Sequence, residues 1–80
     1  MAGLINWPFI FRGEIDDANQ AVLSGWYRGS NNTANFPSKY GVVIVFEAWG
    51  YWAQLGVNHF GTFMYRITDN ISNWPEWQQL

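Results

Sequence analysis

The segment Gly-Val-Val-Ile-Val-Phe-Glu-Ala-Trp-Gly-Tyr-Trp-Ala-Gln-Leu-Gly-Val, residues 41–57, decides the fold. Its first part, 41–47, is a short apolar run rich in β-branched residues, which is typical of a strand covered on both faces. The tripeptide at 48–50 offers a glycine where a tight turn requires a positive φ, and 51–57 then returns as a second strand. The segment predicts a β-hairpin at the centre of a sheet, with Ile44 and Phe46 in the core.

Toward the C-terminus, a turn at 58–61 leads to a third strand at 62–67, where apolar and other side chains alternate with a period of two. These strands predict a mainly β fold built on a small antiparallel meander. After a turn at 69–70, residues 74–80 fit either an edge strand or a helical turn capped by Asn73. We expect Trp74 and Trp77 to pack back onto the meander and close the domain.

Toward the N-terminus, the elements are shorter. Residues 7–12 are rich in β-formers, but Pro8 cannot donate to a ladder, which predicts an edge strand. Residues 16–23 fit a short helix or turn with acidic residues at its start. Residues 26–28 fit a short strand, and residues 29–38 fit a long loop. We expect one knob-like domain over 1–80, with an edge strand or tail at 1–16 and the knob at 17–80.

Composition and charge exclude several classes of protein. The chain has no cysteine and one histidine, so disulfides, thiolate sites and histidine clusters for zinc are not expected. A net charge of −2 with four scattered basic residues disfavours nucleic-acid binding. The N-terminus has no readable secretory signal, and no apolar run is long enough to span a membrane.

Catalytic chemistry is also not expected, because no nucleophile, base and orienting group can be named around His59. We expect a domain that is not an enzyme and carries no cofactor. The acidic residues Glu14, Asp16 and Asp17 could bind calcium, but they lack the further ligands of a loop site. We therefore interpret them as charges at the start of a short helix.

A lone chain of this size has little stability to spare. Folding buries on the order of 8,500 Å², which at ~25 cal/mol/Å² for the apolar part contributes about 125 kcal/mol. Ordering the chain costs about 120 kcal/mol at ~1.5 kcal/mol per residue. Six Trp, four Tyr and six Phe are also more rings than so small a core encloses easily. Both observations predict an oligomer.

A set of short motifs over 17–80 carries a family resemblance. In chain order the motifs are Asp17-Ala18-Asn19, Ser24-Gly25-Trp26-Tyr27-Arg28, Phe36-Pro37, Tyr40-Gly41-Val42-Val43-Ile44-Val45, Gln54, Tyr65-Arg66 and Trp74-x-x-Trp77-x-x-Leu80. Their order and spacing resemble the pyocin-knob type domain found at or near the tips of phage and R-type pyocin tail fibres. The resemblance implies a trimeric, β-rich knob on a virion or phage-tail-like particle, associated with attachment to a bacterial surface. The chain departs from the pattern in having about sixteen residues before Asp17, where a tail fibre carries a shaft.

Candidate ligand-binding residues are polar and aromatic side chains in turns. Trp49, Tyr51 and His59 lie in or beside turns, where an exposed ring can stack on a sugar. The alternative is packing against a partner subunit or against their own turn. Amides in the long loop suit uncharged glycans, with a solvated turn as the alternative. These amides belong to Asn31, Asn32 and Asn35.

The geometry of a meander limits how these residues combine. Successive hairpin turns lie at opposite ends of a sheet, so Trp49 and His59 cannot share one site on one subunit. We expect the long loop to join Trp49 and Tyr51 as the binding end. Four further rings fall in expected strands or the closing segment and are assigned to core packing, namely Trp26, Phe46, Phe63 and Trp77.

Three functions follow as hypotheses. The first is a trimeric tail-fibre tip that attaches to a bacterial surface glycan or receptor and joins the remainder of a fibre. The second is a purely structural module that trimerises or caps a fibre. The third is a free-standing, monomeric carbohydrate-binding module, which a concave row of exposed Trp and Tyr on one subunit would favour.

Overall fold

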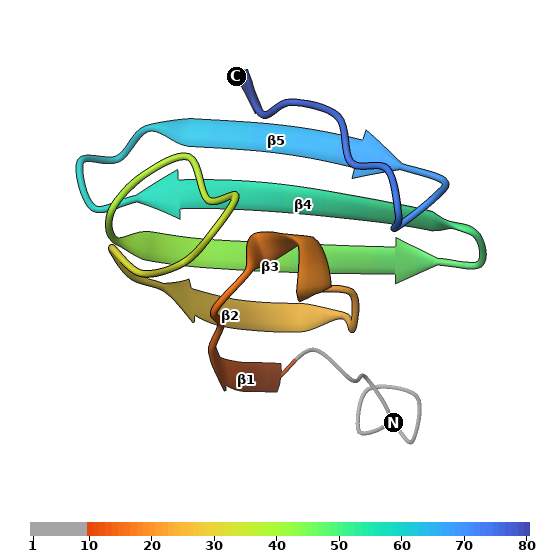
Figure 1. Cartoon of the computed structure of the whole chain (residues 1–80), viewed down its shortest axis with the longest axis horizontal. Helices are drawn as coiled ribbons and strands as arrows, with labels where there is room; N and C mark the ends of the chain where they lie inside the picture. The colour runs from red at the N-terminus through yellow and green to blue at the C-terminus, as the bar shows by residue number, and fades with distance from the viewer. Residues whose placement is uncertain (1–9) are drawn as a thin grey trace, which may run out of the picture.

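The computed structural model describes residues 10–80, which form one six-stranded sheet with strand order β1-β2-β3-β4-β5-β6 (Figure 1). The strands are β1 (Ile10–Glu14), β2 (Gly25–Gly29), β3 (Gly41–Ala48), β4 (Tyr51–Asn58), β5 (Phe63–Thr68) and β6 (Gln78–Gln79). The expectation of a mainly β fold built on an antiparallel meander is confirmed. Residues 7–9 of the expected edge strand lie outside the described residues.

The β3–β4 hairpin is the longest ladder of the sheet. It pairs every residue of β3 with β4, from Gly41 with Asn58 to Ala48 with Tyr51. Trp49 and Gly50 form the turn with φ of 34° and 100°, and positive φ at both central residues is the geometry that matches the twist of a two-residue hairpin. The predicted turn at 48–50 is confirmed, with a tryptophan where asparagine is the more usual residue.

The two edges of the sheet are built differently. β1 runs parallel to β2 and is connected to it through a 3-10 helix, η1 (Ala18–Gln20), in which the Asp17 side chain accepts from the Asn19 N–H as a cap. The expected short helix or turn at 16–23 is thus present in its shortest form. At the other edge, residues 78–79 pair with β5, so the C-terminal segment ends in an edge strand and not in a helix. No helix within residues 10–80 has the length and apolar character to cross a membrane.

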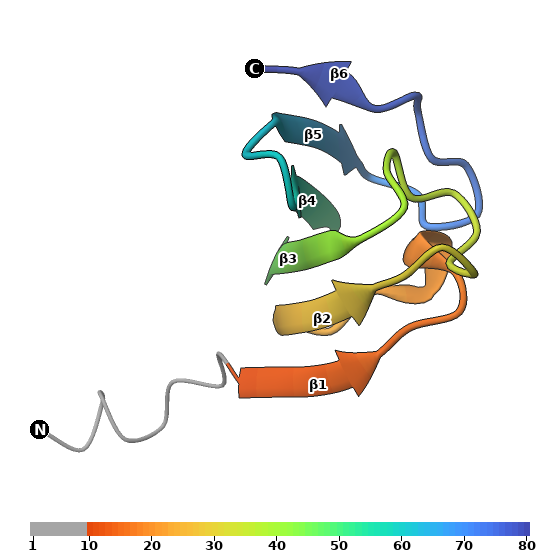
Figure 2. The ribbon, with the colours of Figure 1, turned by 90° about the vertical axis from the view of Figure 1, so that its left-hand side faces the viewer.

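The connecting segments pack on one face of the sheet. In Figure 2 the helix η1, the β2–β3 loop and the segment before β6 all lie on the same side. Between them and the sheet lies a small core, whose fully buried apolar residues are Ala18, Ala21, Val43 and Val45, with Tyr27 nearly so. We call this the covered face.

The expectation that Ile44 and Phe46 lie in the core is therefore wrong, because the core residues of this strand are their neighbours Val43 and Val45. Successive side chains of a strand point to opposite faces, so Val43 and Val45 face the core while Ile44 and Phe46 face away from it. The expectation that β3 is covered on both sides also fails for the single chain, since Phe46 is 50% exposed. An apolar run predicts a strand but does not say which of its faces the rest of the chain covers.

A polar network joins the covered face to the connection through η1. The Gln54 side chain, 1% exposed, donates to the carbonyls of Ala18 and Ala21 at 2.7 and 2.9 Å and accepts from Arg66 Nε at 2.7 Å. Arg66 Nη2 also donates to Asn19 Oδ1 at 2.8 Å. No buried side-chain nitrogen or oxygen of the described chain lacks a partner, so these groups are buried without an unmet hydrogen bond.

The two closing tryptophans sandwich this arginine. The guanidinium carbon lies 4.5 Å from the ring centre of Trp74 and 4.4 Å from that of Trp77. The Trp77 ring also sits over Gly56, where an added Cβ would come within 3.2 Å of it. Burial lowers the pKa of Arg66 to about 10, with the charge of Asp17 acting in the opposite direction, so the side chain is charged at neutral pH. The prediction that Trp74 and Trp77 pack back onto the meander is confirmed.

Candidate functional site

The six predicted ligand-binding residues are divided between the two ends of the sheet. Trp49 and Tyr51 lie at the β3–β4 turn. The β2–β3 loop begins after Gly29, which pairs with Gly41, and Gly41 pairs with Asn58 beside the His59 turn. The expectation that the loop joins Trp49 and Tyr51 is therefore wrong, because an antiparallel ladder places the loop at the opposite end. Asn31, Asn32 and Asn35 share that end with His59.

The asparagine-rich loop is a folded turn with few free polar groups. Thr33 is buried, accepts from the Ser30 N–H at 2.9 Å and donates to the Ile15 carbonyl at 2.7 Å. Asn35 has a φ of 58°, and its side chain donates to Asp17 while its carbonyl accepts from Trp77 Nε1. Asn35 is thus occupied in holding the loop to η1 and to the C-terminal segment, whereas Asn31 and Asn32 are exposed.

His59 packs within its own turn. Its ring centre lies 4.0 Å from that of Phe60 and 5.8 Å from that of Tyr40, and its backbone N–H donates to the Tyr40 carbonyl. This geometry matches the alternative to ligand contact, in which His59 packs against its own turn. In the described chain no cluster of three or more His, Cys, Asp or Glu could hold a metal ion, and of the acidic residues at 14–17 Asp17 caps η1 while Glu14 faces Arg28 at 3.9 Å.

The other end of the sheet carries the most exposed aromatic residues that the sequence singled out. Trp49 is 98% exposed and Tyr51 59% exposed. Across the ladder from Tyr51 is Ala48, whose methyl group is too small to cover a phenol ring. Trp49 is held only through its backbone, whose N–H donates to the Glu47 carboxylate at 3.0 Å.

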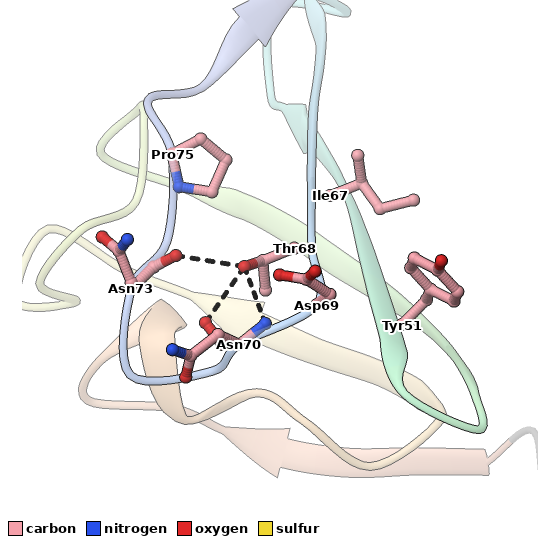
Figure 3. A pocket seen from close by; sticks show the side chains of 7 residues that line it. All are labelled: Tyr51, Ile67, Thr68, Asp69, Asn70, Asn73 and Pro75. Carbon is pink, nitrogen blue, oxygen red and sulfur yellow. Dashed lines mark hydrogen bonds between the residues drawn. The ribbon is translucent and has the colours of Figure 1, made fainter.

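A hollow of about 490 Å³ lies next to Tyr51 (Figure 3). Its lining residues come from the start of β4, the end of β5 and the segment that follows, and they are Tyr51, Ile67, Thr68, Asp69, Asn70, Asn73 and Pro75. Tyr51 and Ile67 stand on one side, Asn73 and Pro75 on the other, with Asp69 and Asn70 between them. We call this the Tyr51 hollow.

Thr68 holds the polar side of the Tyr51 hollow in shape. Its buried hydroxyl contacts the carbonyls of Asn70 and Asn73, each at 3.0 Å, and the Asn70 N–H at 3.1 Å, as the dashed lines in Figure 3 mark. The sequence predicts a turn at Asp69 and Asn70 but does not identify them as site residues. Their proximity to Tyr51 follows only from the β4–β5 register, in which Trp52 pairs with Thr68.

A second hollow, of about 400 Å³, opens beside the Arg66 network. Its lining includes Asn19, Asn35, Arg66, Trp74 and Trp77. Nε and Nη2 of Arg66 and the indole N–H groups of both tryptophans are already bonded within the chain. This hollow therefore belongs to the closure of the domain.

The face of the sheet opposite the covered face is apolar across five strands. Cross-strand pairing aligns Trp26, Ile44, Leu55 and Tyr65 in one row, flanked by rows through Val42 and Phe46. We call it the apolar face, and its apolar centre consists of Phe11, Trp26, Val42, Ile44, Phe46, Ala53, Leu55, Val57, Phe63, Tyr65 and Ile67, with Arg28, Ala48 and Tyr51 at its margins. All of them are exposed or half-buried, so the assignment of Phe46 and Phe63 to the core of a single chain is wrong.

Comparison with solved structures finds a likeness to a bacterial fibre. The structure of the P. aeruginosa R1 pyocin fibre comprising C-terminal residues 323–701 superposes with a TM-score of 0.70 and 26% sequence identity. The likeness covers 89% of this chain and 21% of that one, so this chain spans about a fifth of the fibre fragment. Neither a family model nor a curated protein matches. The predicted pyocin-fibre-like fold is confirmed.

Proposed function

We propose that this chain is a knob domain of a phage tail fibre, or of the fibre of a phage-derived particle, and that three copies assemble through the apolar face. The observation that carries the proposal is that face, which presents aromatic and aliphatic side chains on β1 to β5 while the described connections pack on the other side. Contiguous exposed apolar surface of this kind marks an interaction site.

The composition of the apolar face favours a protein partner. Leu55, Ile44 and Val57 at its centre have no polar group, and Phe46 and Phe63 have no hydrogen-bonding edge. A sugar platform needs polar groups beside its rings, whereas the core of a subunit interface is depleted of charge and enriched in aromatic residues. A second and a third copy of the same chain supply matching surfaces without any other component.

Similarity to the R1 pyocin fibre supports the location of this domain on a tail fibre, in contact with further fibre parts. In that setting the domain takes part in attachment to a bacterial surface glycan or receptor, without catalysis. The purely structural role remains the second candidate, because the apolar face serves assembly alone equally well. A monomeric carbohydrate-binding module has less support, because the covered face of the described chain is filled by η1, the loop and the closing tryptophans.

Molar mass in solution tests the assembly. Light scattering at micromolar concentration is expected to give about three times the 9.3 kDa chain mass. Ile44→Asp, at the centre of the apolar face, is expected to abolish the trimer, since a buried unpaired carboxylate is strongly unfavourable. Leu23→Asp is the matched control, because Leu23 is 59% exposed and lies outside the sheet. A cooperatively folded monomer of the unaltered chain contradicts the proposal.

A further inference from the structure

We propose that the Tyr51 hollow binds an uncharged sugar ring. This inference rests on the proposed role of the domain in surface attachment and names the site and ligand class for it. The volume of about 490 Å³ lies within the range of small-molecule sites, and one hexose fills only part of it. The open side leaves room for a longer glycan to continue.

One side of the hollow supplies an apolar platform. Tyr51 is 59% exposed and Ile67 55% exposed, and both project from neighbouring strands at the same end of the sheet. A sugar ring has a face of C–H groups that packs on an aromatic ring, while the Tyr51 hydroxyl can bond a sugar hydroxyl at the ring edge. Figure 3 shows the phenol ring on the same side as Ile67.

The other side supplies planar polar groups that have no partner in the described chain. The Asp69 carboxylate and the Asn73 amide make no hydrogen bond within residues 10–80, and Asn70 uses only Oδ1, which accepts from the Ser72 N–H at 3.0 Å. The Thr68 hydroxyl fixes the backbone on which these side chains stand. A carboxylate accepts from two hydroxyls, and an amide both donates and accepts, which matches the alternating groups of a sugar.

The charge of the hollow selects among sugars. Asp69 is the only charged residue among the seven that line it. An acidic sugar would place a second negative charge beside this carboxylate with no cation in the lining to offset it. We therefore infer a preference for neutral hexoses over uronic acids with the same ring.

The hollow lies at the rim of the apolar face, because Tyr51 and Ile67 project from that face at the end of the sheet. An assembly centred on the row through Ile44 and Leu55 leaves this rim at its margin. Its polar side belongs to residues 69–75, which lie past the end of β5 on the side of the connecting segments (Figure 2). Trimerisation would bring three copies to one particle, so weak single contacts could combine, with avidity gains of ~10² to 10⁴.

Ligand-observed NMR with soluble sugars tests the site. Glucose, galactose, mannose and N-acetylglucosamine form the neutral panel, and glucuronic acid is the charged counterpart of glucose. At least one neutral sugar is expected to bind with a dissociation constant on the order of millimolar, as befits a ligand of about a dozen heavy atoms. Glucuronic acid is expected to bind at least ~10-fold more weakly.

Four variants locate the binding. Tyr51→Ala is expected to weaken it at least ~10-fold, while Tyr51→Phe retains most of it because the stacking surface is kept. Asp69→Asn is expected to reduce the discrimination between glucose and glucuronic acid. Trp49→Asn is the matched control: it removes the neighbouring exposed ring, and asparagine is favoured at the positive φ of this turn. The fold of each variant is checked by its NMR spectrum.

Two results would overturn the inference. One is that no sugar of the neutral panel binds the folded protein. The other is that binding survives Tyr51→Ala or is lost equally in Trp49→Asn. Failure here is separable from failure of the proposed function, because the sugar assay needs neither cells nor a trimer. If the protein is a trimer that binds no sugar, only the sugar site is refuted. If it is a monomer that binds sugar, only the proposed assembly is refuted.

Discussion

Replacing Arg66 by methionine should remove the contacts through which this side chain holds the η1 connection and the two closing tryptophans on the sheet. Methionine keeps the straight, apolar stem but loses the guanidinium. The change deletes the hydrogen bonds to Gln54 at 2.7 Å and Asn19 at 2.8 Å, and the stacking on two indole rings. It also leaves the Gln54 Oε1 atom unpaired in a side chain that is 1% exposed.

The magnitude follows from these contacts. Hydrogen bonds to a charged group contribute about 1.5 to 3 kcal/mol each, and each cation–π contact about 0.5 to 2 kcal/mol. The sum overstates the loss, because burying the guanidinium also carries a desolvation penalty, which the lowered pKa of Arg66 reflects. Removing one partner of a buried charged network typically costs ~3 to 5 kcal/mol, and we expect this range. For a domain of this length each kilocalorie shifts Tm by about 4 to 8 °C.

Urea unfolding followed by tryptophan fluorescence measures the loss, at one fixed protein concentration because association shifts the midpoint. Lys39→Met is the matched control. Lys39 is exposed in the β2–β3 loop, outside the sheet, so the expected change is below ~1 kcal/mol. If Arg66→Met costs no more than this control, the stacked arginine does not hold the domain together.

Two further predictions concern the core and the closing segment. Val45→Ala should destabilise the chain by about 2 to 3 kcal/mol at any protein concentration, because it opens a cavity at a fully buried site. Ile44→Ala should cost less in dilute protein and more as copies associate, and equal losses at all concentrations in urea titrations would contradict the assignment of faces. Removing residues 74–80 should unfold the chain, because both rings that sandwich Arg66 are lost. A truncated chain with native far-UV circular dichroism and native molar mass would show that the segment is dispensable.

The local features of the fold were predictable where a short-range pattern determines them. The apolar run at 41–47 and the alternation at 62–67 predicted strands, and the Trp49-Gly50 turn was found at the expected residues. The pairing of Trp74 and Trp77 with the meander was also foreseen. These features depend on the alternation of strands, on turn chemistry and on large rings that must be covered, all of which are visible within a few residues.

The choice of face was not predictable in the same way. Val43, Ile44, Val45 and Phe46 are all apolar, so their pattern does not say which pair faces the core. The decision comes from Gln54 and Arg66, whose hydrogen bonds anchor the short η1 connection to one face, and from the stacking of Arg66 on the closing tryptophans. A glutamine and an arginine in a strand are ordinarily assigned to solvent, and only their distant partners make them core residues.

The site shows the same division between local and long-range information. Tyr51 was a candidate from its place beside a turn, whereas Asp69 and Asn70 were taken for turn residues. Asn73 was taken for a possible helix cap and Asn35 for a ligand. Sequence by itself determined a mainly β meander with the pyocin-fibre-like motif order and an excess of aromatic residues. Tertiary structure alone decided which residues meet at each end of the sheet and which apolar face stays open, because strand register and chain reversal bring together residues that lie far apart in the sequence.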